Sequence, residues 1–229
     1  MALYAIGDLH LSLGAPKPMD IFGGSWVGYM EKLESGLSVI RPEDTTVLLG
    51  DLSWALDLQN ATADFSWIDR IPGRKIILKG NHDYWWSTVA KFQAFCAEHG
   101  FTNQFLLNNN HFEYNGWAIC GTRGWFFEEE KSGQHDEKVF RRELMRLEAS
   151  LRSAGDLPKM VFLHYPPQYK GYECRGILEL LKQYSVRRCF FGHLHGPSHN
   201  LAMEGLWDGI EYRLVSADKL DFRPFQVFL

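Results

Sequence analysis

The chain has 229 residues, of which 45% are hydrophobic and 23% are charged, a composition typical of a folded globular protein. Its length fits one large domain or two small ones and can bury a sizeable core. The formal net charge of -4 argues against the basic surface that sequence-independent nucleic-acid binding requires. No apolar run approaches the length that spans a membrane. We therefore expect a globular protein with neither a membrane partner nor a strong nucleic-acid partner.

The cysteines indicate the cellular compartment. None forms a Cys-x-x-Cys pair, and Cys120 and Cys189 lie in apolar, strand-like runs. Cysteines of this kind are typical of reduced core residues in a cytosolic protein. The N-terminus passes from Met1 directly into the apolar run at residues 2–6, without the basic segment or cleavage site of a signal peptide. We expect a cytoplasmic location.

Apolar runs alternate with amphipathic segments along the chain. The strand-like runs are residues 3–6, 46–49, 75–78, 105–107, 112–114, 117–120, 160–163, 189–191, 212–215 and 225–229. Apolar residues at helical spacing predict helices over 26–40, 63–70, 89–99, 139–151 and 177–184. The acidic run Glu128-Glu129-Glu130 is expected to be a solvated loop. The alternation predicts an α/β fold with helices packed outside a sheet, in a single domain over residues 1–229.

Five of the strand-like runs end in residues that can bind a metal. These residues are Asp8 and His10, Asp51, Asn81 and His82, His164, and His193 and His195. In open α/β sheets, sites form beyond the carboxyl ends of the strands. Residues i and i+2 of an extended chain point to the same side, so the Asp-x-His and His-x-His pairs can each aim at one place. We expect these loops to converge at one edge.

The donor set predicts the kind of metal site. Two carboxylates, one amide oxygen and four or five imidazoles are too many for one tetrahedral zinc. They suit two metals that share a bridging carboxylate and lie roughly 3.5–4 Å apart. Nitrogen and oxygen donors without cysteine favour Mn, Fe, Zn, Co or Ni, and the sequence does not choose among them. With a bridging hydroxide the centre would carry a charge of about +1, which favours an anion such as phosphate.

These motifs resemble, in order and context, those of the calcineurin-like metallophosphoesterases. The matching segments are Asp8-x-His10, Gly50-Asp51, Gly80-Asn81-His82-Asp83, His164 and Gly192-His193-x-His195-Gly196. The resemblance covers nearly the whole chain and implies an α/β sandwich of two mixed β-sheets flanked by helices, in four αββα layers. It also implies two divalent metal ions and their ligands. One metal takes Asp8, His10 and His195, the other takes Asn81, His164 and His193, and Asp51 bridges them.

The resemblance further implies hydrolysis of a phosphomonoester or phosphodiester by attack of a metal-bridging hydroxide. His82 is expected to contact the substrate phosphate, beside Asn81, and to protonate the leaving oxygen as a general acid. Histidine can supply a proton near neutral pH. Asp83 is a candidate to orient His82. The expected partner is a phosphorylated small molecule or a nucleotide-like substrate, and nothing in the sequence indicates the oligomeric state.

Other side chains near strand ends are candidates for lining the substrate pocket. Arg123 can clamp a phosphate, although a surface arginine on a turn fits the sequence as well. Four tryptophans follow strand ends: Trp54, Trp85, Trp86 and Trp125. They can form an aromatic wall for a base or an aryl group, and core packing explains them equally. Where many family members carry a further acidic residue, arginine or asparagine, this chain has Ser53-Trp54-Ala55.

Two other functions are compatible with this sequence. One is a non-enzymatic metal-binding scaffold, because a retromer subunit has the same fold without the acid histidine. The presence of His82 argues against it. The other is a nuclease of the same superfamily, which the absence of a basic stretch and of further domains disfavours.

Overall fold

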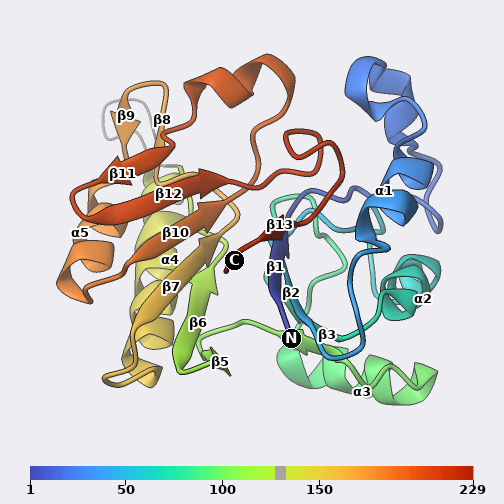
Figure 1. The fold of residues 1–229 in the computed structure, drawn as a ribbon, viewed down its shortest axis with the longest axis horizontal. Helices are drawn as coiled ribbons and strands as arrows, with labels where there is room; N and C mark the ends of the chain where they lie inside the picture. The colour runs from blue at the N-terminus through green and yellow to red at the C-terminus, as the bar shows by residue number, and fades with distance from the viewer. Residues whose placement is uncertain (127–132, 229) are drawn as a thin grey trace. The chain divides into compact units, whose positions relative to one another are not determined.

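The computed structural model describes residues 1–126 and 133–228 (Figure 1). The chain forms two compact units. Unit 1 comprises residues 1–106 and 215–229, and unit 2 comprises residues 107–214. The single domain over residues 1–229 stays a prediction, and the expected acidic loop at Glu128, Glu129 and Glu130 lies outside the described residues. Among the described residues, no helix is long and apolar enough to cross a membrane.

Unit 1 contains a five-stranded sheet with the order β13-β1-β2-β3-β4. The strands are β1 (Leu3–Ile6), β2 (Thr45–Leu48), β3 (Arg74–Ile77), β4 (Gln104–Leu106) and β13 (Phe225–Gln226). Strands β1 to β4 run parallel, and β13 lies antiparallel to β1 at the edge. Strands β1, β2 and β3 have consecutive buried residues, as expected for strands covered on both faces, whereas β4 alternates, with Phe105 exposed. All four parallel strands therefore end at the same edge of this sheet.

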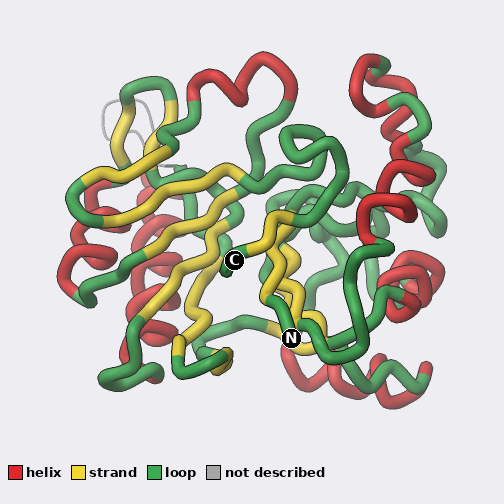
Figure 2. Tube along the Cα trace, in the orientation of Figure 1, coloured by secondary structure: helices red, strands yellow, loops and turns green. Residues whose placement is uncertain are grey.

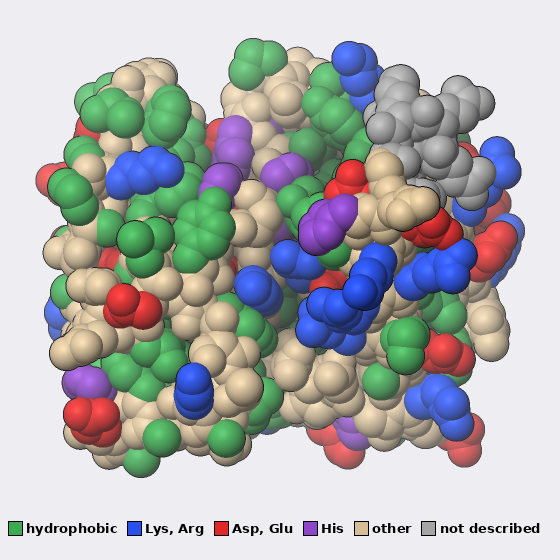
Figure 3. Space-filling model, turned by 180° about the vertical axis from the view of Figure 1, so that it is seen from behind, with side chains coloured by type: hydrophobic (Ala, Val, Ile, Leu, Met, Phe, Trp, Pro, Cys, Tyr) green, Lys and Arg blue, Asp and Glu red, His purple; other side chains and the backbone are tan. Residues whose placement is uncertain are grey.

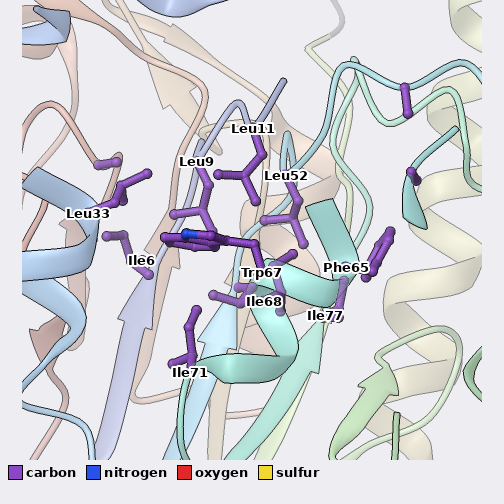
Figure 4. Packing of buried hydrophobic residues seen from close by; sticks show 14 of the residues in the cluster. Ile6, Leu9, Leu11, Leu33, Leu52, Phe65, Trp67, Ile68, Ile71 and Ile77 are labelled. Carbon is purple, nitrogen blue, oxygen red and sulfur yellow. The ribbon is translucent and has the colours of Figure 1, made fainter. Parts of the chain in front are cut away.

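Helices connect these parallel strands and cover the sheet of unit 1. They are α1 (Tyr29–Leu37), α2 (Thr62–Arg70) and α3 (Val89–His99), with short 3-10 turns η1 (Met19–Phe22) and η2 (Gly24–Trp26) before α1. Phe65 and Ile68 of α2 belong to the same buried cluster as Ile6 and Ile77 of the strands (Figure 4). This core fixes the loops that leave the carboxyl ends of β1, β2 and β3.

Unit 2 contains a six-stranded sheet with the order β11-β12-β10-β7-β6-β5. Its strands are β5 (Phe112–Tyr114), β6 (Trp117–Thr122), β7 (Lys159–Leu163), β10 (Arg188–Phe191), β11 (Gly205–Trp207) and β12 (Ile210–Leu214). The four central strands are parallel, and β5 and β11 pair antiparallel at the edges. A separate small hairpin joins β8 (Gln168–Tyr169) and β9 (Tyr172–Glu173).

Two helices, α4 (Gln134–Ser153) and α5 (Arg175–Gln183), pack on the sheet of unit 2, and a 3-10 turn, η3 (Gly196–Leu201), follows β10. Leu147 of α4 and Leu181 of α5 share a buried cluster with Val161 and Cys189 of the strands. The predicted α/β fold with two mixed sheets flanked by helices is confirmed.

Three features of the fold differ from the sequence pattern. The first helix begins at Tyr29 rather than near Trp26, because Gly28 has a left-handed backbone with φ 65°. The strands on either side of Asn108-Asn109-Asn110 lie in different sheets, since β4 pairs with β3 and β5 pairs with β6. Strands β8, β9 and β11 have two or three residues each, too few to produce a periodic signal.

Candidate metal centre

In unit 1 the predicted ligands lie in loops that continue the sheet beyond its strands (Figure 2). The Asp8 N–H donates to Gly50 O at 2.9 Å, and the His10 N–H donates to Asp51 O at 2.9 Å. Further along, the Leu11 N–H donates to Leu52 O at 2.8 Å. The loops after β1 and β2 therefore run side by side, which keeps Asp8, His10 and Asp51 close together.

Several predicted ligands have an unusual backbone conformation. Asp8, His10 and Asp51 in unit 1 have φ of 62°, 47° and 51°, and His193 in unit 2 has φ of 72°. The left-handed region is unfavourable for residues with a Cβ atom and costs roughly 1–3 kcal/mol per residue. Such conformations persist only where the surroundings enforce them, and they concentrate at functional sites.

In unit 1 the carboxylate of Asp83 provides many of the contacts that hold the backbone in this conformation. It is fully buried and accepts backbone N–H groups of Asp51 at 2.8 Å, Leu52 at 2.9 Å and Gly80 at 2.7 Å. The indole Nε1 of Trp85 donates to it at 2.8 Å. Burial, reinforced by the nearby charge of Asp51, raises the pKa of Asp83 to about 6. Asp83 thus joins the loops after β2 and β3, and its role in orienting His82 stays a prediction.

The unit 1 donors are close enough to share a metal. Asp8 and His10 each offer a ligand atom within 4.8 Å of the other, and His10 Nε2 lies 3.9 Å from Asp51 Oδ2. All three side chains are at most 3% exposed. Burying two carboxylates is unfavourable without a compensating charge. Together with a nitrogen donor, this set fits a divalent metal that accepts mixed oxygen and nitrogen ligands.

The loop after β3 places His82 beside these donors. Its backbone N–H donates to Asp51 Oδ1 at 2.7 Å, which helps to orient that carboxylate. The His82 ring lies 4.4 Å from the ring of Trp54 and 5.9 Å from that of His10, measured between centroids. His82 and the preceding Asn81 are half-buried. The structure therefore brings Asp51, His82 and His10 into one region of unit 1.

In unit 2 the predicted histidines follow the adjacent strands β7 and β10. His164 is fully buried directly after β7, and its ring centroid lies 5.1 Å from that of His193. These two rings offer ligand atoms within 4.8 Å of each other. His195 precedes η3 with an extended backbone. The backbone N–H groups of His164 and Tyr165 both donate to Arg123 O, at 3.1 and 2.9 Å, so the end of β6 positions this loop.

The half-buried Arg123 side chain lies in an ionic cluster around the buried carboxylate of Glu143. Its Nη2 is 3.3 Å from Glu143 Oε1, and the same oxygen accepts Arg146 Nη1 at 2.7 Å. Thr122 Oγ1 donates to the other Glu143 oxygen at 2.7 Å. Because two guanidinium groups share one carboxylate, the cluster has a net positive charge. The Arg123 guanidinium also lies 4.7 Å from the ring of Trp125.

The four tryptophans have different environments. Trp85 is 2% exposed and packs edge-on against Phe65, so it belongs to the core, and half-buried Trp86 packs against Trp85. Trp54 stacks on His10 with centroids 4.9 Å apart. Trp125 is half-buried, with its ring centroid 5.3 Å from that of Tyr165. Trp54 and Trp125 are therefore the two that lie beside residues of the candidate site.

Sequence reasoning missed two buried carboxylates that support these loops. Asp64 of α2 accepts the Leu13 N–H at 2.8 Å and the hydroxyl of Ser53, and so connects the loops after β1 and β2. Glu143 of α4 is the second. Each lies on the buried face of its helix, since Asp64 precedes Ile68 and Glu143 precedes Leu147 by four residues. A charged residue at an apolar position of a helical repeat was the available signal.

The model of the calcineurin-like phosphoesterase family matches residues 1–197, a range that contains every predicted metal ligand. The chain belongs to the calcineurin-like phosphoesterase family. As a member of this family it is a hydrolase that acts on phosphoester bonds and depends on metal. No curated protein was found to match the chain in sequence.

Solved structures share the fold of this calcineurin-like phosphoesterase at low identity. Phosphopantetheinyl hydrolase from Mycobacterium tuberculosis is 15% identical over 99% of this chain and 95% of its own, with a TM-score of 0.61. A protein of unknown function from Aquifex aeolicus is 18% identical over 98% of this chain and 95% of its own, with a TM-score of 0.52. A protein from Thermus thermophilus is 16% identical over 84% of this chain and 81% of its own, with a TM-score of 0.55.

The close approach of Gly80 to Asp51 allows a test that alters no ligand. A Cβ atom at Gly80 would overlap both Asp51 N and Asp51 Oδ1. Gly80→Ala should therefore displace the carboxylate and weaken metal binding by about 10-fold or more. Metal content after loading with Mn, measured by mass spectrometry, checks this. Gly133→Ala is the matched control because no atom lies within 4 Å of its added Cβ. Equal metal content in wild type and Gly80→Ala would contradict the role assigned to this contact.

Proposed function

We propose that this phosphoesterase holds two divalent metal ions through seven side chains. The proposed ligands are Asp8, His10 and His195 for one ion, Asn81, His164 and His193 for the other, and Asp51 as the bridge. Membership of the family supports this assignment. So does the number of donors, which exceeds what one ion takes. The observation that carries it is the clustering of donors beyond the strand ends in each unit, with Asp8, His10, Asp51 and His164 buried and several donors on left-handed backbone.

The chemistry follows from the placement of His82 beside the unit 1 donors. When bound, the metal ions would supply an activated water and neutralise charge on the phosphate. As the new oxygen–phosphorus bond forms, the bond to the leaving oxygen breaks and His82 donates a proton to that oxygen. Asn81, the residue before His82, is proposed to contact the phosphate in addition to its metal. Asp83 acts by holding the backbone of Asp51 through the hydrogen bonds described above.

Arg123 is proposed to bind an oxygen of the substrate phosphate. Its Nε is buried and has no hydrogen-bond acceptor among the described residues. The net positive charge of the Glu143 cluster favours an anion there, and a guanidinium presents paired donors that match phosphate oxygens. The Arg123 carbonyl oxygen already holds the backbone of His164, so the guanidinium belongs to the same local framework as a proposed ligand.

The substrate class is a phosphomonoester or phosphodiester of a small, nucleotide-like molecule, and the metals are drawn from Mn, Fe, Zn, Co and Ni. A cytoplasmic location is part of this proposal, supported by four buried cysteines in the thiol form. A nuclease is less favoured because the formal net charge of the chain is -4. The face drawn in Figure 3 carries a group of basic side chains with acidic ones around it. A non-enzymatic scaffold is less favoured because His82 is present.

Replacing the proposed bridge should remove metal from both positions. Wild-type protein should bind about two ions per chain and hydrolyse 4-nitrophenyl phosphate with added Mn. Asp51→Asn should lose most of both ions, since an amide carries no charge to balance them. Metal analysis and a phosphatase assay check this, with the exposed Asp57→Asn as the control. Unchanged metal content in Asp51→Asn would refute the bridging role.

Replacing His82 should affect the reaction according to its leaving group. An alkyl leaving group needs a proton, so His82→Ala should lower kcat by about 100-fold or more for an alkyl phosphate. The loss should be much smaller for 4-nitrophenyl phosphate, whose leaving group is stable as an anion. Metal content should stay at the wild-type value, and exposed His135→Ala should behave as wild type. Full activity of His82→Ala on both substrates would rule out the acid role.

Replacing Arg123 should weaken substrate binding more than turnover. Arg123→Lys keeps the charge but loses the paired donors, so KM should rise by about 10-fold with a smaller change in kcat. Arg146→Lys is the matched control, because it perturbs the same Glu143 carboxylate from its other arginine. Steady-state kinetics on 4-nitrophenyl phosphate separate the two effects. An equal rise in KM for both variants would assign Arg123 to the structure alone.

A further inference from the structure

Lys17 of unit 1 places its ammonium group directly over Trp54. Its Nζ lies 3.4 Å from the centroid of the Trp54 ring. The side chain is exposed, and its backbone lies between Pro16 and Pro18, with the Lys17 N–H donating to Ala15 O at 2.8 Å. Proline on both sides restricts the backbone of this segment. The loop therefore presents one cation at a defined place.

Trp54 connects this cation to the proposed general acid. Its backbone N–H donates to Leu11 O at 3.0 Å, and its ring stacks on His10 with an angle of 21° between the planes. The same ring lies 4.4 Å from that of His82. Only 8% of Trp54 is exposed, so its position is set by packing. A single aromatic ring therefore separates the Lys17 ammonium from His82.

The charge of Lys17 is available to a ligand. Among the described residues no carboxylate forms an ion pair with it, and its observed contact is with an aromatic face. An exposed cation–π contact is weak, on the order of 0.5–1 kcal/mol. A phosphate group, with up to two negative charges and several acceptor oxygens, is a stronger partner for an ammonium. Lys17 can thus leave the ring when such a group arrives.

Resting on the proposed function, we propose that Lys17 binds a second phosphate carried by the leaving group of the substrate. His82 donates its proton to the leaving oxygen, so the leaving group lies on the side of His82. The Trp54 ring packs against the His82 ring, and the Lys17 ammonium rests on the Trp54 ring, so the cation lies within one aromatic ring of the proton donor. The substrate class is therefore a phosphoester whose leaving group itself bears a phosphate, and Lys17 is the residue that selects it.

A matched pair of nucleotides tests this assignment. Adenosine 3′,5′-bisphosphate carries a second phosphate on either leaving group, whereas adenosine 5′-monophosphate carries none. With Mn-loaded protein, kcat/KM should be about 10-fold or more higher for the bisphosphate, mainly through a lower KM. Lys17→Met should reduce this preference to about 1, Lys17→Arg should retain most of it, and exposed Lys91→Met should leave it unchanged. Calorimetric binding to the His82→Ala protein should show the same preference.

Two outcomes overturn the inference in distinguishable ways. If the wild type hydrolyses both nucleotides and 4-nitrophenyl phosphate without preference, or if the preference survives Lys17→Met, Lys17 does not select the leaving group and the proposed function stands. If the Mn-loaded wild type hydrolyses none of these monoesters and also fails to hydrolyse the diester bis(4-nitrophenyl) phosphate, the proposed function fails and this inference fails with it.

Discussion

The buried carboxylate of Asp83 holds the backbone on which the unit 1 donors depend. It accepts hydrogen bonds from backbone N–H groups of the loop after β2 and of the loop after β3. The two loops therefore share one hydrogen-bond acceptor, which takes the place of water. A carboxylate without a cation is unfavourable in the interior, and its several donors offset that cost. The resulting network holds Asp51 at a φ of 51°, a conformation that an isolated aspartate seldom adopts. Asp83 therefore holds the backbone from which the Asp51 side chain extends, and the His82 N–H orients the Asp51 carboxylate itself.

The same arrangement recurs at two further places. Asp64 of α2 joins the loops after β1 and β2 through Leu13 and Ser53. In unit 2, Glu143 of α4 holds Thr122 and Arg123, and the Arg123 carbonyl oxygen then holds the backbone of His164. In each case a helix or loop contributes one buried carboxylate to the end of a parallel strand. The loops after β1 and β2 keep some backbone hydrogen bonds to each other, such as Asp8 N–H to Gly50 O, and the buried carboxylates satisfy further N–H groups beyond the strand ends.

The candidate ligands were predictable because parallel strands end at a common edge and polar residues interrupt an apolar run there. His164 follows such a run directly, and Asp8 and Asp51 each follow one after a single glycine. The left-handed backbone at His10 and His193 was not predictable, because it results from contacts made by residues distant in sequence. The same holds for the chain around Asn109, where propensity indicates a turn but pairing assigns the flanking strands to different sheets. Local sequence patterns indicate whether a segment forms a helix or a strand. The register of the strands and the strain of the backbone depend instead on tertiary contacts.

The rigidity of the donors contrasts with the exposure of Lys17. Metal ligands must be held in a narrow geometry, and buried carboxylates, paired loops and strained backbone all act to that end in unit 1. A residue that recognises the leaving group must instead admit substrate and release product. An exposed lysine resting on the face of Trp54 meets that requirement, because its contact is weak and its side chain is long. Trp54 contributes to both the rigid donors and the exposed cation, since it packs against His10 and His82 and also supports the Lys17 ammonium. In this proposal the loop after β2 therefore contributes a metal ligand, Asp51, and also Trp54, which supports the residue that selects the substrate.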